Sequence, residues 1–293
     1  MMINKRESAF RQALEQRLRT IHYKDKIPLS RLRKTIAFDR FLARLLQINP
    51  DKWILKGGLS LELRLGQQAR TTKDMDLLSF SQPEEVYGLL FISGKLNLDD
   101  YFEFQVNKPI NEAFETTAGT RYSINCLVDG RLFEQFHVDI GVNDKLLEPY
   151  ELLKMPSYLD FAKIDSTKVP CYSINQQIAE KLHAMTKPYK SGESSRAKDL
   201  VDILILASFS PLNLNKLKHV VFSTFSNRNT HPLPNCVSIL NPSHQKTFIN
   251  LSNQVNLRFK QIEEANNAIN VLLSPIFADE KNMKWDPIKF IWD

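Results

Sequence analysis

The stretch KGGLSLELRLGQQARTTKDMDLL, residues 56–78, places a pair of glycines shortly before a pair of aspartates. The chain has nine glycines, and two of them are adjacent at Gly57 and Gly58. The apolar residues 53–55 predict a short strand before them, and residues 59–65 predict a short helix after them. A strand, a glycine turn and a helix let phosphate oxygens approach backbone N–H groups closely. We therefore expect a phosphate-binding turn at Gly57 and Gly58, with the Ser60 hydroxyl as a further donor.

The next predicted strand, residues 75–80, has Asp76 near its start, and Asp74 directly precedes it. Side chains at positions i and i+2 of a strand share one face, so the carboxylates of Asp74 and Asp76 point the same way. Such a pair suits Mg²⁺ or Mn²⁺, which prefer oxygen ligands. A third carboxylate, Asp139, alternates with apolar residues in FEQFHVDIGV, residues 133–142, and so lies on the polar face of another strand. Three such carboxylates predict a two-metal site for phosphoryl transfer.

The rest of the chain predicts an α+β fold with a small mixed sheet between N-terminal helices and a helical C-terminal half. A boundary near residue 155 would separate residues 1–155 from a mostly helical domain, 156–293. The prolines after residue 150 are typical of a linker, and residues 225–245 are typical of a long loop. The remaining predicted strands are 101–108, 120–129 and 132–142. The predicted helices are 7–21, 29–47, one opening at Pro83, 174–187, 194–208, 212–224 and 258–273.

Charge is unevenly distributed along the chain, which has a net charge of +6. Residues 1–60 contain 14 Lys and Arg against 5 Asp and Glu. This balance favours a polyanionic partner such as a nucleic acid, although basic solvated helix faces are also common. Along the predicted helix 29–47, five basic side chains are expected on the exposed side: Arg31, Arg33, Lys34, Arg40 and Arg44.

Several classes of protein are disfavoured by composition. No apolar run is long enough to span a bilayer, and the N-terminus lacks the apolar segment of a signal peptide. Three widely separated cysteines favour a reducing, cytoplasmic compartment over disulfides or a zinc site. No histidine has metal-ligand spacing. We give His137 and His183 no acid–base role, although His137 shares the predicted face of Asp139 and an indirect role stays open.

Four motifs in order resemble the AbiEii/AbiGii branch of the polymerase-β-like nucleotidyltransferases, toxins of type IV toxin–antitoxin systems that are related to the MenT toxins. The first is KGGLSLELR followed by TTKDMD, and FHVDIG stands in the place of the second. The third and fourth are NQQIAEKLHAM, residues 175–185, and SSRAKDLVDIL, residues 194–204. The resemblance covers about residues 50–207. It leaves out the N-terminal helices and the last part of the chain.

The resemblance implies roles for individual residues. Lys181 would neutralise the triphosphate and Asp199 would act near the nucleotide or acceptor, whereas Asp202 is expected to pair with a nearby basic group. The family arginine after the glycines corresponds to Arg64 or Arg70. The implied catalytic residues are Asp74, Asp76, Asp139, Lys181 and Asp199. The implied nucleotide-binding residues are Lys56, Gly57, Gly58, Ser60, Thr72, Lys181 and Arg196, and the metal ligands are Asp74, Asp76 and Asp139.

The expected activity is a metal-dependent transfer of NMP from an NTP to an acceptor hydroxyl, with release of pyrophosphate. The resemblance implies the 3′ end of tRNA as acceptor, no membrane association and a separately encoded antitoxin. Two alternatives stay open: transfer to a small-molecule or protein hydroxyl, and an inactive nucleotide- or RNA-binding module. The sequence alone does not identify the base, the acceptor or the antitoxin.

Overall fold

A computed structural model describes residues 2–109, 119–142, 144–188, 196–237, 242–278 and 280–293. For residues 2–5, 196, 242 and 243 it describes the backbone alone. The chain forms two compact units. Unit 1 comprises residues 1–64, 71–144 and 151–171, and unit 2 comprises residues 65–70, 145–150 and 172–293. The boundary expected after residue 155 therefore lies inside unit 1.

Unit 1 is built on a seven-stranded mixed sheet of order β3-β4-β5-β2-β1-β7-β6. Its helices are α1 (Met2–Asp25), α2 (Leu29–Ile48), α3 (Gly57–Leu65) and α4 (Pro83–Lys95). Its strands are β1 (Trp53–Lys56), β2 (Asp74–Ser79), β3 (Phe102–Val106), β4 (Thr120–Val128), β5 (Arg131–Gly141), β6 (Glu151–Lys154) and β7 (Lys168–Cys171).

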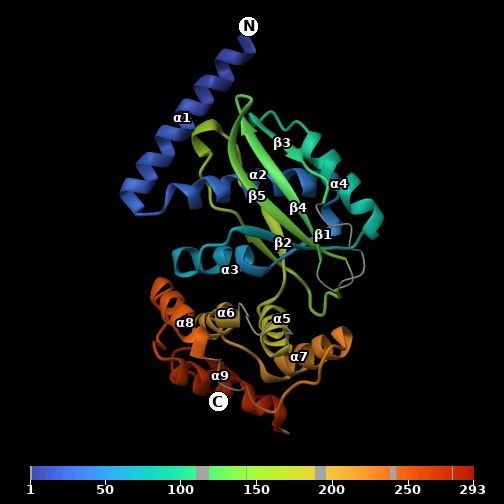
Figure 1. Ribbon diagram of the computed structural model, residues 1–293, viewed down its shortest axis with the longest axis vertical. Helices are drawn as coiled ribbons and strands as arrows, with labels where there is room; N and C mark the ends of the chain where they lie inside the picture. The colour runs from blue at the N-terminus through green and yellow to red at the C-terminus, as the bar shows by residue number, and fades with distance from the viewer. Residues whose placement is uncertain (1, 110–118, 143, 189–195, 238–241, 279) are drawn as a thin grey trace. The chain divides into compact units, whose positions relative to one another are not determined.

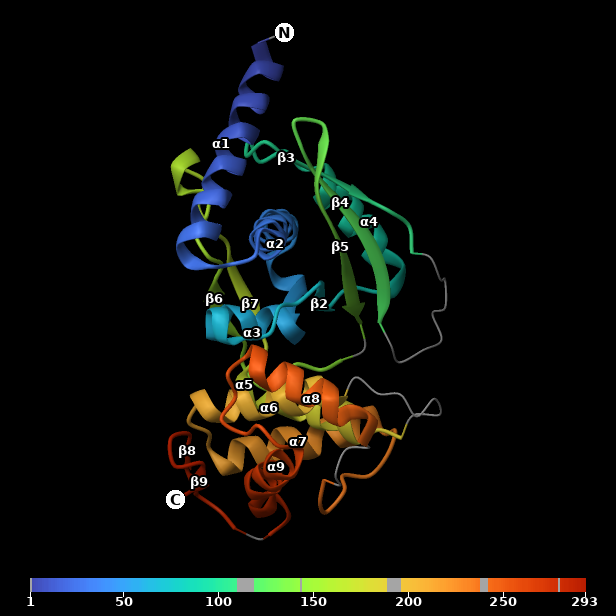
Figure 2. The same ribbon diagram turned by 60° about the vertical axis from the view of Figure 1, so that its left-hand side comes forward.

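One face of this sheet packs against α2, which Figure 2 shows end-on beside β5. Phe38 and Phe41 of α2 meet Phe136 of β5 with ring centroids 5.0 and 5.9 Å apart. The helix α1 adds Phe10, Leu14 and Leu18 to the same core, at the spacing that the sequence predicts. Alternate residues of β5 are buried, as expected for a strand with one apolar face. The other face of the sheet is left for polar side chains.

Two of the basic side chains of α2 are buried, contrary to the sequence prediction. Arg40 and Arg44, expected on its exposed side, are 4% and 0% exposed. Arg44 forms a two-pronged ion pair with Asp100, with N–O distances of 2.6 and 2.8 Å. Arg40 is paired with Asp39, and burial raises the pKa of Asp39 even though Arg40 opposes it. A charge buried on a helix needs a partner, so these arginines are structural.

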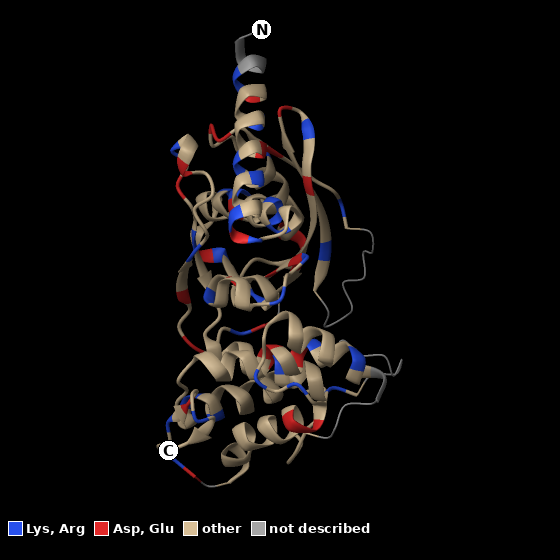
Figure 3. Cartoon of the chain, turned by 90° about the vertical axis from the view of Figure 1, so that its left-hand side faces the viewer, with Lys and Arg blue, Asp and Glu red and all other residues tan. Residues whose placement is uncertain are grey.

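Other basic groups of the N-terminal region are also paired. Arg31 lies 2.7 Å from Glu62, and Arg33 lies 2.6 Å from Glu15. Lys34 lies 3.5 Å from Glu134. Figure 3 shows basic and acidic residues interspersed over α1 and α2. Within the described residues, five exposed basic side chains of α1 and the turn after it form no ion pair: Arg6, Arg17, Arg19, Lys24 and Lys26.

The segment expected to be a linker completes the sheet. β7 runs parallel to β1, with Leu55 opposite Cys171, and β6 pairs antiparallel with β7. Both strands have four residues, and Pro170 lies within β7. The linker prediction was wrong. Short strands that contain proline have no reliable local sequence signal, and here the pairing of β7 with β1 overrides the preference of proline for irregular structure.

Unit 2 is mostly helical, as expected. Its helices are α5 (Ile174–Thr186), α6 (Arg196–Phe209), α7 (Leu214–Arg228), α8 (Pro242–Gln254) and α9 (Ile262–Phe277), and a short hairpin joins β8 (Trp285–Asp286) to β9 (Ile291–Trp292). The expected loop over 225–245 is wrong at both ends, because α7 extends to Arg228 and α8 begins at Pro242. Proline is favoured in the first turn of a helix, a signal masked here by the surrounding Asn and Pro. Among the described residues, no helix is long and apolar enough to cross a membrane.

Candidate active site

The glycine pair and the aspartate pair meet because β1 and β2 are antiparallel neighbours. Lys56, at the end of β1, lies opposite Asp76 on β2. The next residue, Gly57, has φ of +67° and begins α3. A Cβ atom at this position would lie 1.9 Å from Oδ2 of Asp76. Gly57 therefore serves two needs: it adopts a left-handed backbone conformation, and it leaves room for the Asp76 carboxylate.

Four charged residues form one row across four adjacent strands. Arg121 on β4 lies opposite Asp139 on β5, Asp139 lies beside Asp76 on β2, and Asp76 lies opposite Lys56 on β1. We call Lys56, Asp76, Asp139 and Arg121 the charged row. Paired residues of neighbouring strands project from the same face of a sheet. The row thus places two carboxylates side by side, with a cationic side chain at each end.

Asp74 belongs to the adjoining level of the sheet, opposite His137. Nδ1 of His137 lies 3.3 Å from Oδ1 of Asp74, so His137 does share the carboxylate face. The hydroxyl of Thr72 donates to the backbone carbonyl of Asp74 over 3.0 Å and thereby fixes the start of β2. Asp74 and Asp139 keep 34% and 27% of their side chains exposed. Both carboxylates can therefore be reached from solvent.

Arg121 contacts two of the carboxylates on this face. Its Nε and Nη2 atoms donate to the two carboxylate oxygens of Asp139 over 2.8 and 2.7 Å. Nη2 also lies 3.4 Å from Oδ2 of Asp74. The hydrogen bonds to Asp139 raise the pKa of Arg121 further above its ordinary value, so its guanidinium stays charged. Neither the predicted motifs nor the resemblance pointed to Arg121; its only signal was a basic residue on the exposed face of a strand.

The predicted metal ligands have the donor chemistry that a divalent cation prefers and lie on one face of the sheet. Asp74, Asp76 and Asp139 supply hard carboxylate oxygens from one face of two neighbouring strands. In the described part of the chain, however, no three acidic, histidine or cysteine side chains converge closely enough to hold an ion. The oxygens of Asp139 are instead bonded to Arg121. A cation bound by these three carboxylates would therefore require a side-chain rearrangement.

Two of the predicted phosphate-binding residues have partners inside unit 1. The hydroxyl of Ser60 is fully buried and accepts a 2.6 Å hydrogen bond from Arg64. Nζ of Lys56 donates to Asp144 over 2.6 Å. These contacts position the turn, while a phosphate contact by either residue stays a prediction.

Unit 2 contains the residues of the third and fourth motifs, where Lys181 and Asp202 form a buried ion pair. Nζ of Lys181 lies 2.6 Å from Asp202 and 3.7 Å from Asp199. Arg70 donates to both oxygens of Asp202 over 3.0 and 2.9 Å. The expectation that Asp202 pairs with a basic group is therefore confirmed. Lys181 is only 9% exposed, with its Nζ atom held by Asp202.

Charge coupling in this cluster outweighs burial. Burial alone would raise the pKa of Asp202, but Lys181 and Arg70 lower it below its usual range. Burial alone would lower the pKa of Lys181, but Asp202 and Asp199 raise it. Both groups are thus kept ionised. Of the other motif residues, Arg196 begins α6, and its side chain lies outside the described residues.

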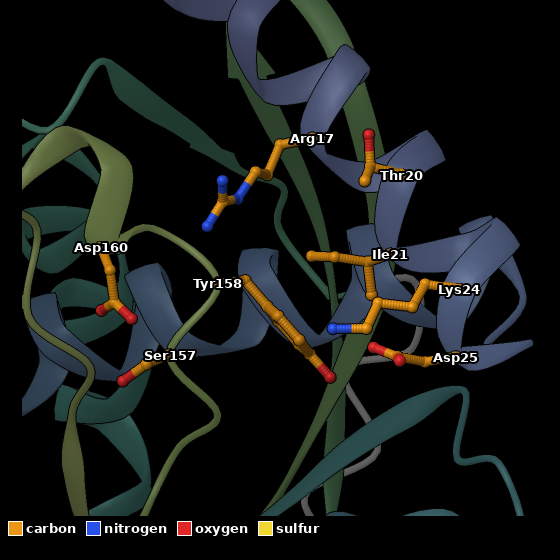
Figure 4. Close-up of a pocket in the computed structure, with 8 residues that line it drawn as sticks. All are labelled: Arg17, Thr20, Ile21, Lys24, Asp25, Ser157, Tyr158 and Asp160. Carbon is orange, nitrogen blue, oxygen red and sulfur yellow. The ribbon is translucent and has the colours of Figure 1, made fainter.

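Hollows elsewhere in unit 1 do not include the carboxylates. One cavity of about 240 Å³ lies between α1 and residues 157–160. Figure 4 shows Arg17 and Lys24 directed toward it, with the ring of Tyr158 between the two elements. The second, of about 710 Å³, lies beside β3 and the end of α4. The charged row lines neither of these two hollows.

Unit 1 thus combines a strand, a glycine turn and a helix beside a carboxylate strand, with a third carboxylate in register, an arrangement consistent with a nucleotidyltransferase. Residues 40–282 match the family of nucleotidyl transferase AbiEii toxins of type IV toxin–antitoxin systems, and the chain belongs to this family. The match begins in α2 and extends well past residue 207, where the motif resemblance ends.

Three solved structures are similar to the chain, and the likeness to the first of them shows the fold. MenT4, a nucleotidyltransferase toxin from Mycobacterium tuberculosis H37Rv, is 17% identical with a TM-score of 0.55, over 89% of this chain and 87% of that one. JHP933 from Helicobacter pylori is 19% identical with a TM-score of 0.40, over 82% and 97%. An antigenic nucleotidyltransferase-like protein from Paracoccidioides brasiliensis is 14% identical with a TM-score of 0.43, over 76% and 92%. No curated protein sequence matches the chain.

We predict that Gly57→Ala removes most transferase activity and destabilises the protein by more than Gly130→Ala does. Both glycines have positive φ, +67° and +64°, but a Cβ at Gly130 would meet nothing within 4 Å. The shared backbone strain costs about 1 kcal/mol at each position. The additional loss of stability in Gly57→Ala then reflects the clash with Asp76. Urea unfolding measures the stability of both variants, and a nucleotide-transfer assay measures their activity. Equal losses of stability and activity in the two variants would contradict this account.

We also predict that Asp202→Asn lowers the unfolding free energy at pH 7 by about 3 kcal/mol, since it removes the buried carboxylate that Lys181 and Arg70 share. A lowered pKa contributes stability above the unfolded value of about 3.9, and this stability is lost as pH falls through the folded pKa. The difference from wild type should therefore shrink below about pH 4. Thermal unfolding from pH 3 to 7 tests this, with exposed Asp51→Asn as the control. A constant difference across this range would contradict the pairing.

Proposed function

We propose that the chain transfers NMP from an NTP to an acceptor hydroxyl, using Mg²⁺ or Mn²⁺ held by Asp74, Asp76 and Asp139. The observation that carries this proposal is the placement of these three carboxylates on one face of β2 and β5, beside the glycine turn. Among the described residues named above, this face has two more carboxylates than cationic side chains. The carboxylates are Asp74, Asp76, Asp139 and Asp144, and the cationic side chains are Lys56 and Arg121. A divalent cation matches this excess of negative charge.

The residues of this face divide the work of in-line transfer. A bound divalent cation would stabilise the charge of the phosphate and make the acceptor hydroxyl easier to deprotonate. Asp139 lies on β5, beside β4, and we assign it to the acceptor hydroxyl, whose proton it accepts. Asp74 and Asp76 orient the triphosphate. The first N–H groups of α3, exposed by Gly57 and Gly58, stabilise its oxygens. The resemblance adds Lys181 and Asp199 as nucleotide residues.

We further propose tRNA as the acceptor, with toxicity following from modification of its 3′ end and with control by a separate antitoxin. Family membership supports the toxin role. The unpaired basic side chains of α1 support a polyanionic acceptor, since they remain available after internal ion pairs have neutralised much of the N-terminal charge. The surface in question carries Arg6, Arg17, Arg19, Lys24 and Lys26.

The first test incubates the purified protein with Mg²⁺, each α-³²P-labelled NTP in turn and total RNA, followed by a denaturing gel. We expect label in the tRNA band, and Asp76→Asn should reduce it at least about 10²-fold, because the transition-state charge loses its stabilisation. Gln135→Ala, an exposed change on β5, is the control. Nucleotide binding without labelled RNA would favour a protein or small-molecule acceptor. Full toxicity of the Asp76→Asn variant would favour a binding module.

A second prediction concerns the acceptor. The double variant Arg17→Glu/Arg19→Glu should bind RNA more weakly, and the slope of log affinity against log salt should fall by about 1 for each phosphate that the protein no longer neutralises. The control Lys216→Glu/Lys246→Glu makes the same charge change on exposed residues of unit 2. Filter binding at several salt concentrations measures both. An unchanged affinity and slope in the α1 variant would remove the support that α1 gives to an RNA acceptor.

A further inference from the structure

The two cations of the charged row are not equivalent. Lys56 has a carboxylate of its own, since Nζ donates to Asp144 over 2.6 Å. Arg121 instead bonds to Asp139 with two N–H groups and lies 3.4 Å from Asp74. Both of its partners are predicted metal ligands. Arg121 thus occupies the lone pairs of Asp139 that a cation would need.

Exposure and register make this contact reversible. The side chain of Arg121 is 53% exposed, so little packing opposes a change of rotamer. Its backbone is fixed in β4, where it lies directly opposite Asp139. An arginine at this position returns to the same carboxylate whenever no competing charge is present. Without it, the like charges of Asp76 and Asp139 on neighbouring strands would repel each other with less compensation.

We propose that Arg121 is the internal counter-ion of the carboxylate face, and that a divalent cation binds Asp139 only after the guanidinium has left. This inference rests on the proposed function, because it takes Asp74, Asp76 and Asp139 as the metal ligands. Arg121 competes with the cation in the free protein and stabilises the sheet face meanwhile. Once displaced, Arg121 is free to donate to phosphate oxygens of the incoming triphosphate. A guanidinium group binds phosphate oxygens as readily as it binds carboxylate oxygens.

The structure offers a matched pair of variants. Arg121→Gln removes the charge at the row while keeping a polar side chain of similar reach. Arg131→Gln makes the same change at the opposite end of the β4–β5 hairpin, on an exposed arginine. Arg121→Lys keeps the charge and removes the two-pronged geometry. Asp76→Asn in the Arg121→Gln background tests where the cation binds. Loss of Mn²⁺ binding in this double variant places the cation at these carboxylates.

The experiment measures Mn²⁺ binding to the full chain by electron paramagnetic resonance, without nucleotide, together with melting temperature in EDTA and in Mg²⁺. Arg121→Gln should bind Mn²⁺ at least about tenfold more tightly than wild type, because a competing unit charge is gone. Arg121→Lys should fall between them, and Arg131→Gln should match wild type. Arg121→Gln should also melt lower than wild type in EDTA and regain that loss in Mg²⁺.

The possible failures are distinct. Equal or weaker Mn²⁺ binding by Arg121→Gln, with binding by wild type intact, overturns the counter-ion role and leaves the proposed transfer reaction standing. An affinity gain that Arg131→Gln shares reflects net charge alone and also overturns it. Absence of Mn²⁺ binding in every variant, in the presence of nucleotide as well as without it, overturns the metal site of the proposed function and the counter-ion role with it.

Discussion

The site depends on the register of four strands, β1, β2, β5 and β4. That register sets Lys56, Asp76, Asp139 and Arg121 in one row and brings the Asp76 carboxylate against Gly57. A shift of one residue in any pairing would turn the carboxylates toward the core face that α2 covers. Burial of apolar side chains on the α2 face therefore enforces the alignment of charges on the other face. The register of these strands thus serves both the stability of the core and the placement of the site. Gly57 is the residue at which the backbone turn and the Asp76 carboxylate come into contact.

Buried ion pairs stabilise each unit internally. In unit 1 the Arg44–Asp100 pair ties α2 to the start of β3, and in unit 2 the Lys181–Asp202–Arg70 cluster ties α5 to α6 and to residue 70. Removing one partner of such a pair is costly, since the other charge stays buried. Arginines and lysines that look like a nucleic-acid surface in the sequence thus turn out to serve the fold. The basic groups that remain available in the N-terminal region lie mainly on α1.

Opposite charges on the carboxylate face give it two uses. In the free protein, Arg121 and Lys56 offset carboxylates that would otherwise repel one another. Under the proposed function, the same carboxylates would bind a cation, and the same guanidinium would donate to phosphate oxygens. Membership of the AbiEii toxin family places this face in a nucleotidyltransferase.

From the sequence alone, the order of elements through β5, the strand–glycine–helix turn and the shared face of Asp74, Asp76 and Asp139 could be predicted. Each follows from local periodicity, or from the requirement of a turn for glycine. For Asp202 the sequence predicts a basic partner without identifying it as Lys181 or Arg70. Strands β6 and β7, the burial of Arg40 and Arg44, and the contact of Arg121 with Asp139 were decided by the tertiary structure. These features depend on which strands become neighbours and which faces become buried, and both are set by residues far apart in the chain.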